Sequence, residues 1–171
     1  MSDFKPVEIN EDGLLEEEVV ALLLKNKYTI TTAESCTGGL ISGTIVNVSG
    51  ASDVFNEGYV TYSNEAKNRL LGVKKETLEK FGAVSEQVAM EMAKGALNKS
   101  NADVAVAVTG IAGPGGGTKE KPVGLVYIGV AVKEKVSVNK FNFDGDRLTV
   151  RKLTVANALA MVKECVSEYN K

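Results

Sequence analysis

The spacing of apolar and polar residues along the chain predicts several helices. Residues 14–27 repeat apolar side chains at helical intervals and place acids early and lysines late, as the helix dipole prefers. Shorter helical patterns follow over 40–48 and 65–71, and a long one runs from 147 to 169. Residues 85–99 begin with a serine that can cap a helix, and they present one apolar face. That face consists of Val88, Ala89, Met92, Ala93, Ala96 and Leu97.

Strand patterns alternate with the helices at first and become consecutive near the end of the chain. Strands are predicted over 28–33 and 53–63, and Gly58 marks a candidate bulge in the second. Residues 103–109 are apolar except at their ends, which is typical of a strand covered on both faces. Two last strands, 123–132 and 136–143, are joined by a turn-like Lys-Glu-Lys. This order predicts an α/β sandwich with a mixed, mainly parallel sheet.

Composition narrows the class of protein. The 171 residues are 44% apolar and show no linker or repeat, so one domain is expected over 1–171. The net charge of −2 gives no general attraction to nucleic acid or to membranes, and neither partner is expected. The first residues lack the apolar core of a signal peptide, and no apolar run reaches the length of a membrane span. A cytoplasmic location is therefore expected.

Residue types that are absent or scarce exclude several chemistries. The chain has no histidine, so Ser-His-Asp, Cys-His and His-Glu-x-x-His zinc sites cannot form within it. Its two cysteines, Cys36 and Cys165, lie far apart in sequence and are predicted to be free thiols. No cluster of cysteines replaces histidine as a metal ligand, and no metal or other cofactor is expected. Any catalysis must use carboxylates, lysine, tyrosine, hydroxyls or backbone amides.

Three segments that follow predicted strands are candidates for a functional site. They are 33–39 (AESCTGG), 61–67 (TYSNEAK) and 109–117 (TGIAGPGGG). Ligands of open α/β sheets bind beyond the carboxyl ends of the strands, so these loops are expected to share one crevice. The glycine-rich loop lacks the Lys-Ser/Thr ending of a Walker A motif and leads into a strand. It is interpreted either as a flexible turn or as a nest of amides that binds an anion.

The residues of the first loop have competing interpretations. Ser35 and Thr37 follow a strand and precede an apolar helix. Either residue could simply cap that helix, or the loop amides could bind an anion or an oxyanion. Cys36 is either a second candidate nucleophile or a small buried apolar residue.

The residues of the second loop also have competing interpretations when only their spacing is considered. Lys67 is interpreted as a solvated lysine on a short helix, or as the partner of Ser63 in a dyad at i, i+4. Ser63 and Asn64 are also candidate caps for that helix, which Gly72 would end. Tyr59 and Tyr62 belong to the preceding strand pattern, and each could be a surface or a core aromatic.

Taken together, several motifs resemble the CinA C-terminal domain family, the nicotinamide mononucleotide amidohydrolases. They are TTAESCTGG, GYVTYSNEAK, GAVSEQVA, VTGIAGPGGG with KPVGLVYIG, and FDGDR, in order from about residue 10 to the C-terminus. The resemblance implies hydrolysis of nicotinamide mononucleotide to nicotinic acid mononucleotide and ammonia in pyridine nucleotide salvage. It also implies a three-layer α/β/α domain, no metal and frequent dimers. Some members carry an additional N-terminal molybdopterin-binding-like domain, whose functions are not carried over to a chain of this length.

The resemblance also implies catalytic roles. Members of the family use a serine with a lysine, assisted by a tyrosine, and the matching positions are Ser35, Lys67 and Tyr62. Tyr59 is the alternative for the tyrosine. Neutral Lys67 would take the proton of Ser35, which requires a pKa below the usual value of about 10.4. The alternative function is a catalytically weak nucleotide-binding or sensor module of the same fold.

The remaining candidates would hold a small mononucleotide substrate. An oxyanion is expected to bind the amides of one run: Cys36, Thr37, Gly38 and Gly39. The substrate phosphate is expected to contact Arg147 or the amides of the glycine-rich loop. That loop offers Gly110, Ile111, Ala112 and Gly113. Arg147 is otherwise a surface charge beside the cap candidate Asp146, and the assembly is expected to be a homodimer.

Overall fold

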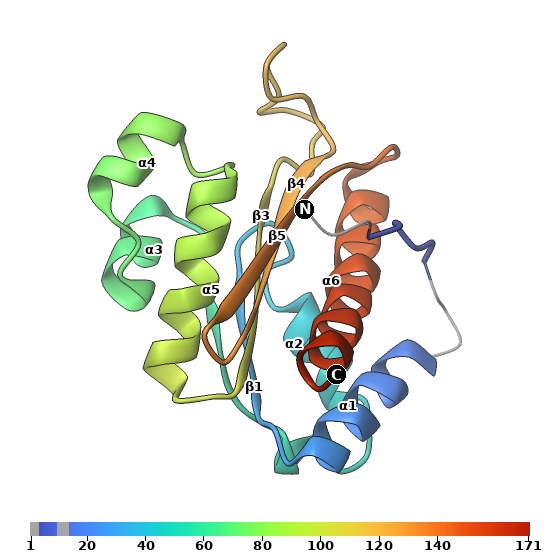
Figure 1. The fold of residues 1–171 in the computed structure, drawn as a ribbon. Coiled ribbons are helices and arrows are strands. Elements are labelled where there is room, and N and C mark those ends of the chain that lie inside the picture. The colour runs from blue at the N-terminus through green and yellow to red at the C-terminus, as the bar shows by residue number, and fades with distance from the viewer. Residues whose placement is uncertain (1–3, 10–13) are drawn as a thin grey trace.

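The computed structural model describes residues 4–9 and 14–171, in which a central sheet is covered by helices on both faces (Figure 1). The sheet has five strands in the order β2-β1-β3-β4-β5. These strands are β1 (Ile30–Glu34), β2 (Phe55–Val60), β3 (Val104–Gly110), β4 (Leu125–Val132) and β5 (Lys135–Asn142). The three layers confirm the α/β/α sandwich expected from the sequence.

Strand directions confirm that the sheet is mixed and mainly parallel. β1 pairs in parallel with β2 and β3, whereas β4 is antiparallel to both β3 and β5. Among the described strands, β4 therefore runs against the other four. β3 lies at the centre and its residues 104–108 are fully buried, because α5 packs on one face and α6 on the other. A strand that is covered on both faces is apolar along its length, which explains the apolar run at 103–109.

The helices divide between the two faces of the sheet (Figure 1). One face carries α3 (Asn64–Leu71), α4 (Lys75–Phe81) and α5 (Glu86–Ser100). The other face carries α1 (Leu14–Asn26), α2 (Leu40–Val46) and α6 (Arg147–Tyr169). A short 3-10 helix, η1 (Ala51–Asp53), precedes β2. The predicted helices are present, and α4 is an addition that the sequence pattern did not indicate.

A bulge in β2 brings that strand close to α2. The register advances two residues along β1 and three along β2 as it reaches Gly58, so the bulge expected at this glycine is confirmed. A Cβ atom on Gly58 would lie 2.5 Å from Thr32 Oγ1 and 2.9 Å from Ser42 Oγ. A glycine is required here because any side chain would push β2 away from β1 and α2.

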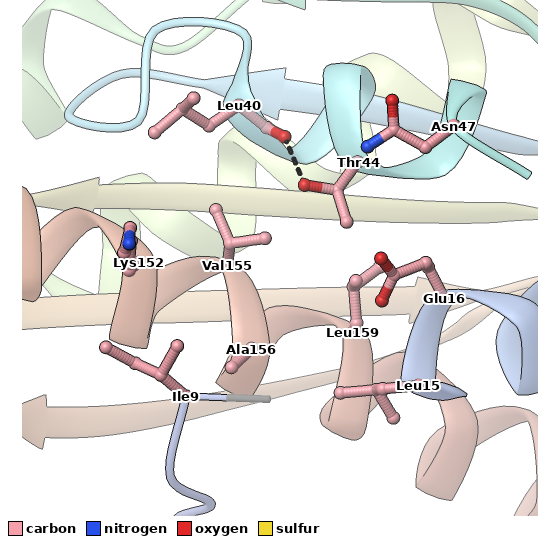
Figure 2. Close-up of a pocket in the computed structure, with 10 residues that line it drawn as sticks. All are labelled: Ile9, Leu15, Glu16, Leu40, Thr44, Asn47, Lys152, Val155, Ala156 and Leu159. Carbon is pink, nitrogen blue, oxygen red and sulfur yellow. Dashed lines mark hydrogen bonds between the residues drawn. The ribbon is translucent and has the colours of Figure 1, made fainter. Parts of the chain in front are cut away.

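The layer formed by α1, α2 and α6 leaves a cavity of about 270 Å³ between its helices and the N-terminal segment (Figure 2). Most of its lining is apolar, with Glu16, Thr44, Asn47 and Lys152 as the polar members. Thr44 Oγ1 donates a hydrogen bond to Leu40 O at 2.8 Å. This cavity lies within the helical layer, whereas the candidate nucleophile Ser35 lines a different cavity.

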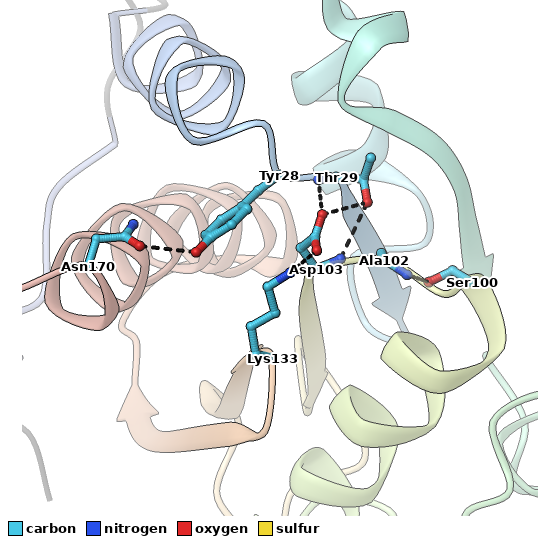
Figure 3. A network of polar contacts seen from close by, with 7 residues as sticks. All are labelled: Tyr28, Thr29, Ser100, Ala102, Asp103, Lys133 and Asn170. Carbon is cyan, nitrogen blue, oxygen red and sulfur yellow. Dashed lines mark hydrogen bonds and ion pairs between the residues drawn. The ribbon is translucent and has the colours of Figure 1, made fainter.

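A polar network lies at the end of the sheet opposite Ser35 (Figure 3). The Asp103 carboxylate, just ahead of β3, accepts hydrogen bonds from Thr29 N at 2.8 Å and from Lys133 Nζ. Lys133 also lies over the Tyr28 ring, 4.8 Å from its centroid, and Tyr28 OH donates to Asn170 Oδ1 at 3.0 Å. These contacts join the start of β3, the β4–β5 turn and the end of α6 at the edge away from Ser35.

Candidate functional site

The ends of β1, β2 and β3 converge on a cavity of about 230 Å³. Its lining comes from all three candidate loops, from the segment before α5 and from the start of α6. The lining residues are Ser35, Cys36, Tyr62, Lys67, Ala83, Val84, Thr109, Gly110, Ala112 and Arg147. The prediction that the three loops share one crevice is therefore confirmed. Thr37, Gly38, Gly39, Ile111 and Gly113 lie outside this lining.

Ser35 and Lys67 meet at the base of the cavity. Ser35 directly follows β1, and its amide donates to Val108 O at 3.1 Å, which fixes it against β3. Lys67 comes from α3 and its Nζ lies 2.9 Å from Ser35 Oγ. The lysine is only 1% exposed, so the interpretation of Lys67 as a solvated side chain is wrong. Ser63 Oγ instead caps α3 by accepting from Ala66 N at 3.0 Å, so the alternative Ser63–Lys67 pair does not form.

The surroundings of Lys67 favour a neutral amine. Nζ also donates to Thr61 O at 2.7 Å and, more weakly, to Tyr62 O at 3.5 Å. Burial lowers the pKa of Lys67 from 10.5 to about 8, and interaction with Cys36 acts in the opposite direction. At pH 7 about a tenth of the amine would therefore be neutral, compared with roughly one part in three thousand for a free lysine. The side chain is available as a base near neutral pH.

Cys36 is a poor nucleophile in this position. The side chain is 5% exposed, and burial raises the pKa of its thiol to about 11. A thiol with this pKa is protonated near neutral pH, and the thiolate is the reactive form. The structure supports the interpretation of Cys36 as a small buried residue beside Ser35.

A buried carboxylate that the sequence interpretation missed organises the first loop. Glu34 is fully buried, and its carboxylate accepts from the amides of Gly39, Ile41 and Ser42 at 2.8–3.0 Å. It also accepts from Ser42 Oγ at 2.8 Å. The Glu34 side chain, and neither the Ser35 nor the Thr37 hydroxyl, therefore accepts from the amides of Ile41 and Ser42 at the start of α2. A carboxylate at the end of a buried strand, a few residues ahead of a helix, was the available signal.

Two of the four expected oxyanion donors are already engaged. Gly38 N donates to Ser35 O at 3.2 Å, and Gly39 N donates to Glu34. These two amides are bound within the protein, which corrects the expectation that they stabilise an oxyanion. In the described part of the chain, no oxygen accepts from the amides of Cys36 and Thr37. The buried Thr37 hydroxyl likewise has no hydrogen-bond partner there.

Arg151 is a second contributor that the sequence interpretation missed. Its Nε donates to Cys36 O at 3.1 Å and its Nη2 donates to Thr37 O at 2.7 Å. The two carbonyl groups belong to the turn that directly follows Ser35. Arg151 lies four residues after Arg147 on α6, so both guanidinium groups leave the same face of the helix. That spacing was the signal available in the sequence.

Arg147 joins the tyrosine loop to the glycine-rich loop. Its Nη1 donates to Gly113 O at 2.7 Å, and its Nη2 donates to Tyr62 OH at 3.0 Å. Tyr62 lines the cavity and remains 64% exposed, whereas Tyr59 is not among the lining residues. Asp146 caps α6 by accepting from Thr149 N at 2.8 Å, as expected. Arg147 therefore belongs to the cavity wall and is more than a charge beside that cap.

The glycine-rich loop contributes a shaped wall. Gly110 and Ala112 line the cavity, while Ile111 N donates to Leu125 O at 2.8 Å and is therefore engaged. Gly113 presents its carbonyl to Arg147. Within residues 110–113, Gly113 O thus accepts a hydrogen bond and Ile111 N already donates one. The interpretation of the loop as a nest of amides that binds an anion stays a prediction.

The segment before α5 closes the remaining side of the cavity. Ala83 and Val84 belong to the lining, and Thr109 Oγ1 donates to Ala83 O at 2.8 Å. Lys121, which follows the glycine-rich loop, donates from Nζ to Phe81 O at 2.6 Å and to Val84 O at 2.7 Å. These residues were not among the sequence candidates, because none of them carries a reactive group that would single it out.

Residues 4–9 and 14–171 contain neither a cluster of metal ligands nor a membrane-spanning helix. No group of three or more His, Cys, Asp or Glu side chains there could hold a metal ion. None of the helices in these ranges has the length and apolar character needed to cross a membrane.

Comparison with known proteins gives a consistent family match. The family described as "CinA C-terminal domain" matches residues 13–166. A protein of Clostridium acetobutylicum, provisionally named a competence-damage inducible protein, is 58% identical over 144 residues. This match covers 84% of the present chain and 35% of the Clostridium protein. A CinA-like protein of Kosmotoga olearia is 56% identical over 152 residues, which are 89% of this chain and 37% of that protein. The chain thus spans little more than a third of these curated relatives.

Solved structures share the fold over nearly their whole length. The competence/damage inducible protein CihA from Agrobacterium tumefaciens is 43% identical and superposes with a TM-score of 0.89. That match covers 98% of this chain and 99% of the Agrobacterium chain. A CinA superfamily protein from Klebsiella pneumoniae is 33% identical, with a TM-score of 0.90, and covers 93% of this chain and 99% of its own.

Proposed function

The chain belongs to the CinA C-terminal domain family, and from this premise we propose that it hydrolyses nicotinamide mononucleotide to nicotinic acid mononucleotide and ammonia. The observation that carries the proposal is the 2.9 Å contact between buried Lys67 Nζ and Ser35 Oγ. The substrate comes from the resemblance of the sequence motifs to the amidohydrolases of this family. The proposed setting is pyridine nucleotide salvage in the cytoplasm, and a homodimer remains a prediction.

The first step is attack by Ser35. A neutral amine has two N–H groups and one lone pair, and the carbonyl oxygens of Thr61 and Tyr62 accept from two N–H groups. The lone pair then faces Ser35 Oγ at 2.9 Å. Nζ takes the hydroxyl proton while Oγ forms a bond to the carboxamide carbon. The Tyr62 backbone thus helps to orient the base.

The developing oxyanion requires hydrogen-bond donors near Ser35. The amides of Cys36 and Thr37 have no oxygen acceptor in the described part of the protein. We assign them this role, in which one donor typically lowers the activation barrier by about 3 kcal/mol. Gly38 and Gly39 are not part of this assignment because their amides are engaged.

Collapse of the tetrahedral intermediate completes acylation. The Lys67 ammonium returns its proton to the amide nitrogen, the C–N bond breaks, and ammonia leaves. A water molecule then gives a proton to Lys67 and adds to the ester carbon. The second intermediate releases Ser35, which regains its proton, and nicotinic acid mononucleotide leaves. Each turnover therefore consumes one water molecule and regenerates both side chains.

The proposal is tested by incubating the purified protein with nicotinamide mononucleotide and separating the products by chromatography. Nicotinic acid mononucleotide and ammonia should appear in equal amounts, with and without a chelator. Ser35→Ala should abolish product, whereas Cys36→Ala should retain substantial activity because the thiol is protonated. No product at high protein concentration would leave the nucleotide-binding or sensor module as the function.

The role of Arg147 is tested by comparing two substrates. Nicotinamide riboside lacks the phosphate, and we expect it to be a far poorer substrate than the mononucleotide. Arg147→Ala should lower kcat/KM for the mononucleotide and barely change it for the riboside, because only the mononucleotide has a phosphate to lose. Equal losses for both substrates would mean that Arg147 acts through its bonds to Gly113 and Tyr62, and the phosphate assignment would be dropped.

A further inference from the structure

We propose that Arg151 is a positioning residue, which holds the turn after Ser35 so that Thr37 N–H points at the oxyanion formed on Ser35. The inference rests on the proposed amidase function and extends it to a residue outside the cavity lining. Its basis is the pair of hydrogen bonds from Arg151 to Cys36 O and Thr37 O. No other described side chain donates to these two carbonyls.

These two hydrogen bonds determine the direction of Thr37 N–H through the geometry of the peptide plane. Cys36 C=O and Thr37 N–H belong to one trans peptide plane, in which the two groups point in opposite directions. Because Arg151 Nε binds Cys36 O at 3.1 Å, Thr37 N–H must point away from the guanidinium group. The second bond, from Nη2 to Thr37 O at 2.7 Å, fixes the next plane and prevents the first from rotating alone.

The turn itself places Ser35 on the side to which this amide points. Gly38 N donates to Ser35 O at 3.2 Å, so residues 35–38 form a hydrogen-bonded β-turn. In such turns a short polar side chain at the first position lies beside the N–H of the third residue. The proposal therefore places Thr37 N–H beside an oxygen on a carbon bound to Ser35 Oγ.

Glu34 binds the chain directly after the turn, at Gly39 and the start of α2. Its buried carboxylate accepts from Gly39 N at 2.9 Å and from two further amides of α2. Glu34 therefore binds amides beyond the turn, while Arg151 binds carbonyl groups within it. This division leaves Thr37 N–H without an oxygen acceptor in the described chain, and a buried donor of this kind gains most when a substrate oxyanion arrives.

The test compares Arg151→Lys and Arg151→Ala with the control Arg69→Lys, which changes an exposed arginine on α3. Both Arg151 variants should lower kcat by about 10- to 100-fold and change KM by less than about threefold, because the ground state is bound as before. Millimolar guanidinium, but not ammonium, should restore part of the activity of Arg151→Ala. Thermal unfolding of each variant identifies any loss of fold. If Arg151→Ala does not fold, the test rests on Arg151→Lys, which keeps the methylene stem of the side chain.

Two outcomes would overturn the inference. A raised KM with unchanged kcat would make Arg151 a substrate-binding residue. Loss of activity that follows thermal stability and is not rescued by guanidinium would make Arg151 only a structural residue.

A fluorophosphonate probe separates this inference from the proposed substrate. Ser35 Oγ forms a bond to phosphorus, fluoride leaves, and Lys67 takes the hydroxyl proton, so labelling depends on the same turn without nicotinamide mononucleotide. Arg151→Lys should label about tenfold more slowly than the wild type and Arg69→Lys equally fast. Wild-type labelling without amidase activity would reject the substrate and still measure the role of Arg151. Failure of the wild type to label at Ser35 would reject both proposals.

Discussion

At the Lys67 side chain, burial and hydrogen bonding act in opposite directions on the charge. The carbonyl oxygens of Thr61 and Tyr62 are acceptors that favour an ammonium group, whereas 1% exposure penalises any charge. Burial is the larger influence, and the pKa of Lys67 falls to about 8. The same two carbonyls also determine which way the neutral amine points. Orientation and basicity of this one residue therefore have separate structural causes.

The lowered pKa of Lys67 predicts a pH profile. Since the neutral amine is the active form, kcat/KM should rise about tenfold per pH unit below the pKa and level off above it. The midpoint is expected near pH 8, where the pKa of Lys67 lies. Initial rates at low substrate concentration, measured from pH 6 to 10, give the profile.

A matched variant ties this profile to Lys67. Lys67→Arg keeps the positive charge but cannot lose a proton in this range, so it should be inactive at every pH. A fully active Lys67→Arg protein, or a profile that is flat through pH 8, would be incompatible with a lysine base.

At the scale of elements, α2 depends on a residue that precedes it in β1. This helix has only seven residues and no cap from its own N-terminal side chains. Glu34 supplies the missing acceptors from the end of the neighbouring strand. The strand and the helix are therefore coupled through one carboxylate, and Ser35 lies between them.

Replacement of Glu34 should destabilise the protein more than the loss of an ordinary cap. Glu34→Ala leaves three amides and the Ser42 hydroxyl without their acceptor in a buried site, at a cost of about 3–5 kcal/mol. Glu34→Gln keeps one oxygen and should cost about 1–2 kcal/mol. Urea unfolding measures both values. The control is Asp146→Ala, which removes the exposed cap of α6 and should cost much less than Glu34→Ala. Equal costs for Glu34→Ala and Asp146→Ala would contradict this account of α2.

For the whole molecule, the burial of Lys67 makes the free energy of unfolding depend on pH. The pKa of Lys67 is about 8 in the folded protein and 10.5 when unperturbed. Between these pH values the unfolded chain holds the proton that the folded protein has released. Folding stability from this residue therefore rises with pH across that interval and is lower below it.

Lys67→Met removes this pH dependence. Wild-type stability should gain roughly 2–3 kcal/mol from Lys67 between pH 8 and pH 10.5, and the methionine variant should lack that gain. The variant should therefore be the more stable protein near neutral pH, with the difference shrinking at high pH. Urea unfolding of both proteins at several pH values gives the difference directly, since other groups titrate equally in both. Parallel stability curves would show that Lys67 has an unperturbed pKa.

The sequence by itself determined the layers and the position of the site. Helical periodicity marked the buried face of α5, of which Val88, Ala89, Met92, Ala93 and Ala96 are buried, while Leu97 is half-buried. The continuous apolar run at 103–109 marked β3 as a strand covered on both faces. These patterns are local, because each residue's burial repeats with the period of its own element. The order of strands and helices then predicted that the loops after the strands lie at one edge of the sheet. Ser35 and Lys67 belong to these loops or to the helix that follows one of them.

Only the tertiary structure decided what those residues touch. α4 has seven residues, and Glu91 on α5 accepts both from Lys74 N at its start and from Thr77 Oγ1. Glu34 and Arg151 likewise bind backbone groups that no sequence spacing links to them in an obvious way. Lys67 looked solvated because its helix is polar, yet its amine is buried against residues that follow β1 and β2, namely Ser35, Thr61 and Tyr62. Hydrogen bonding and desolvation depend on neighbours brought from distant parts of the chain, and periodicity carries no information about those neighbours.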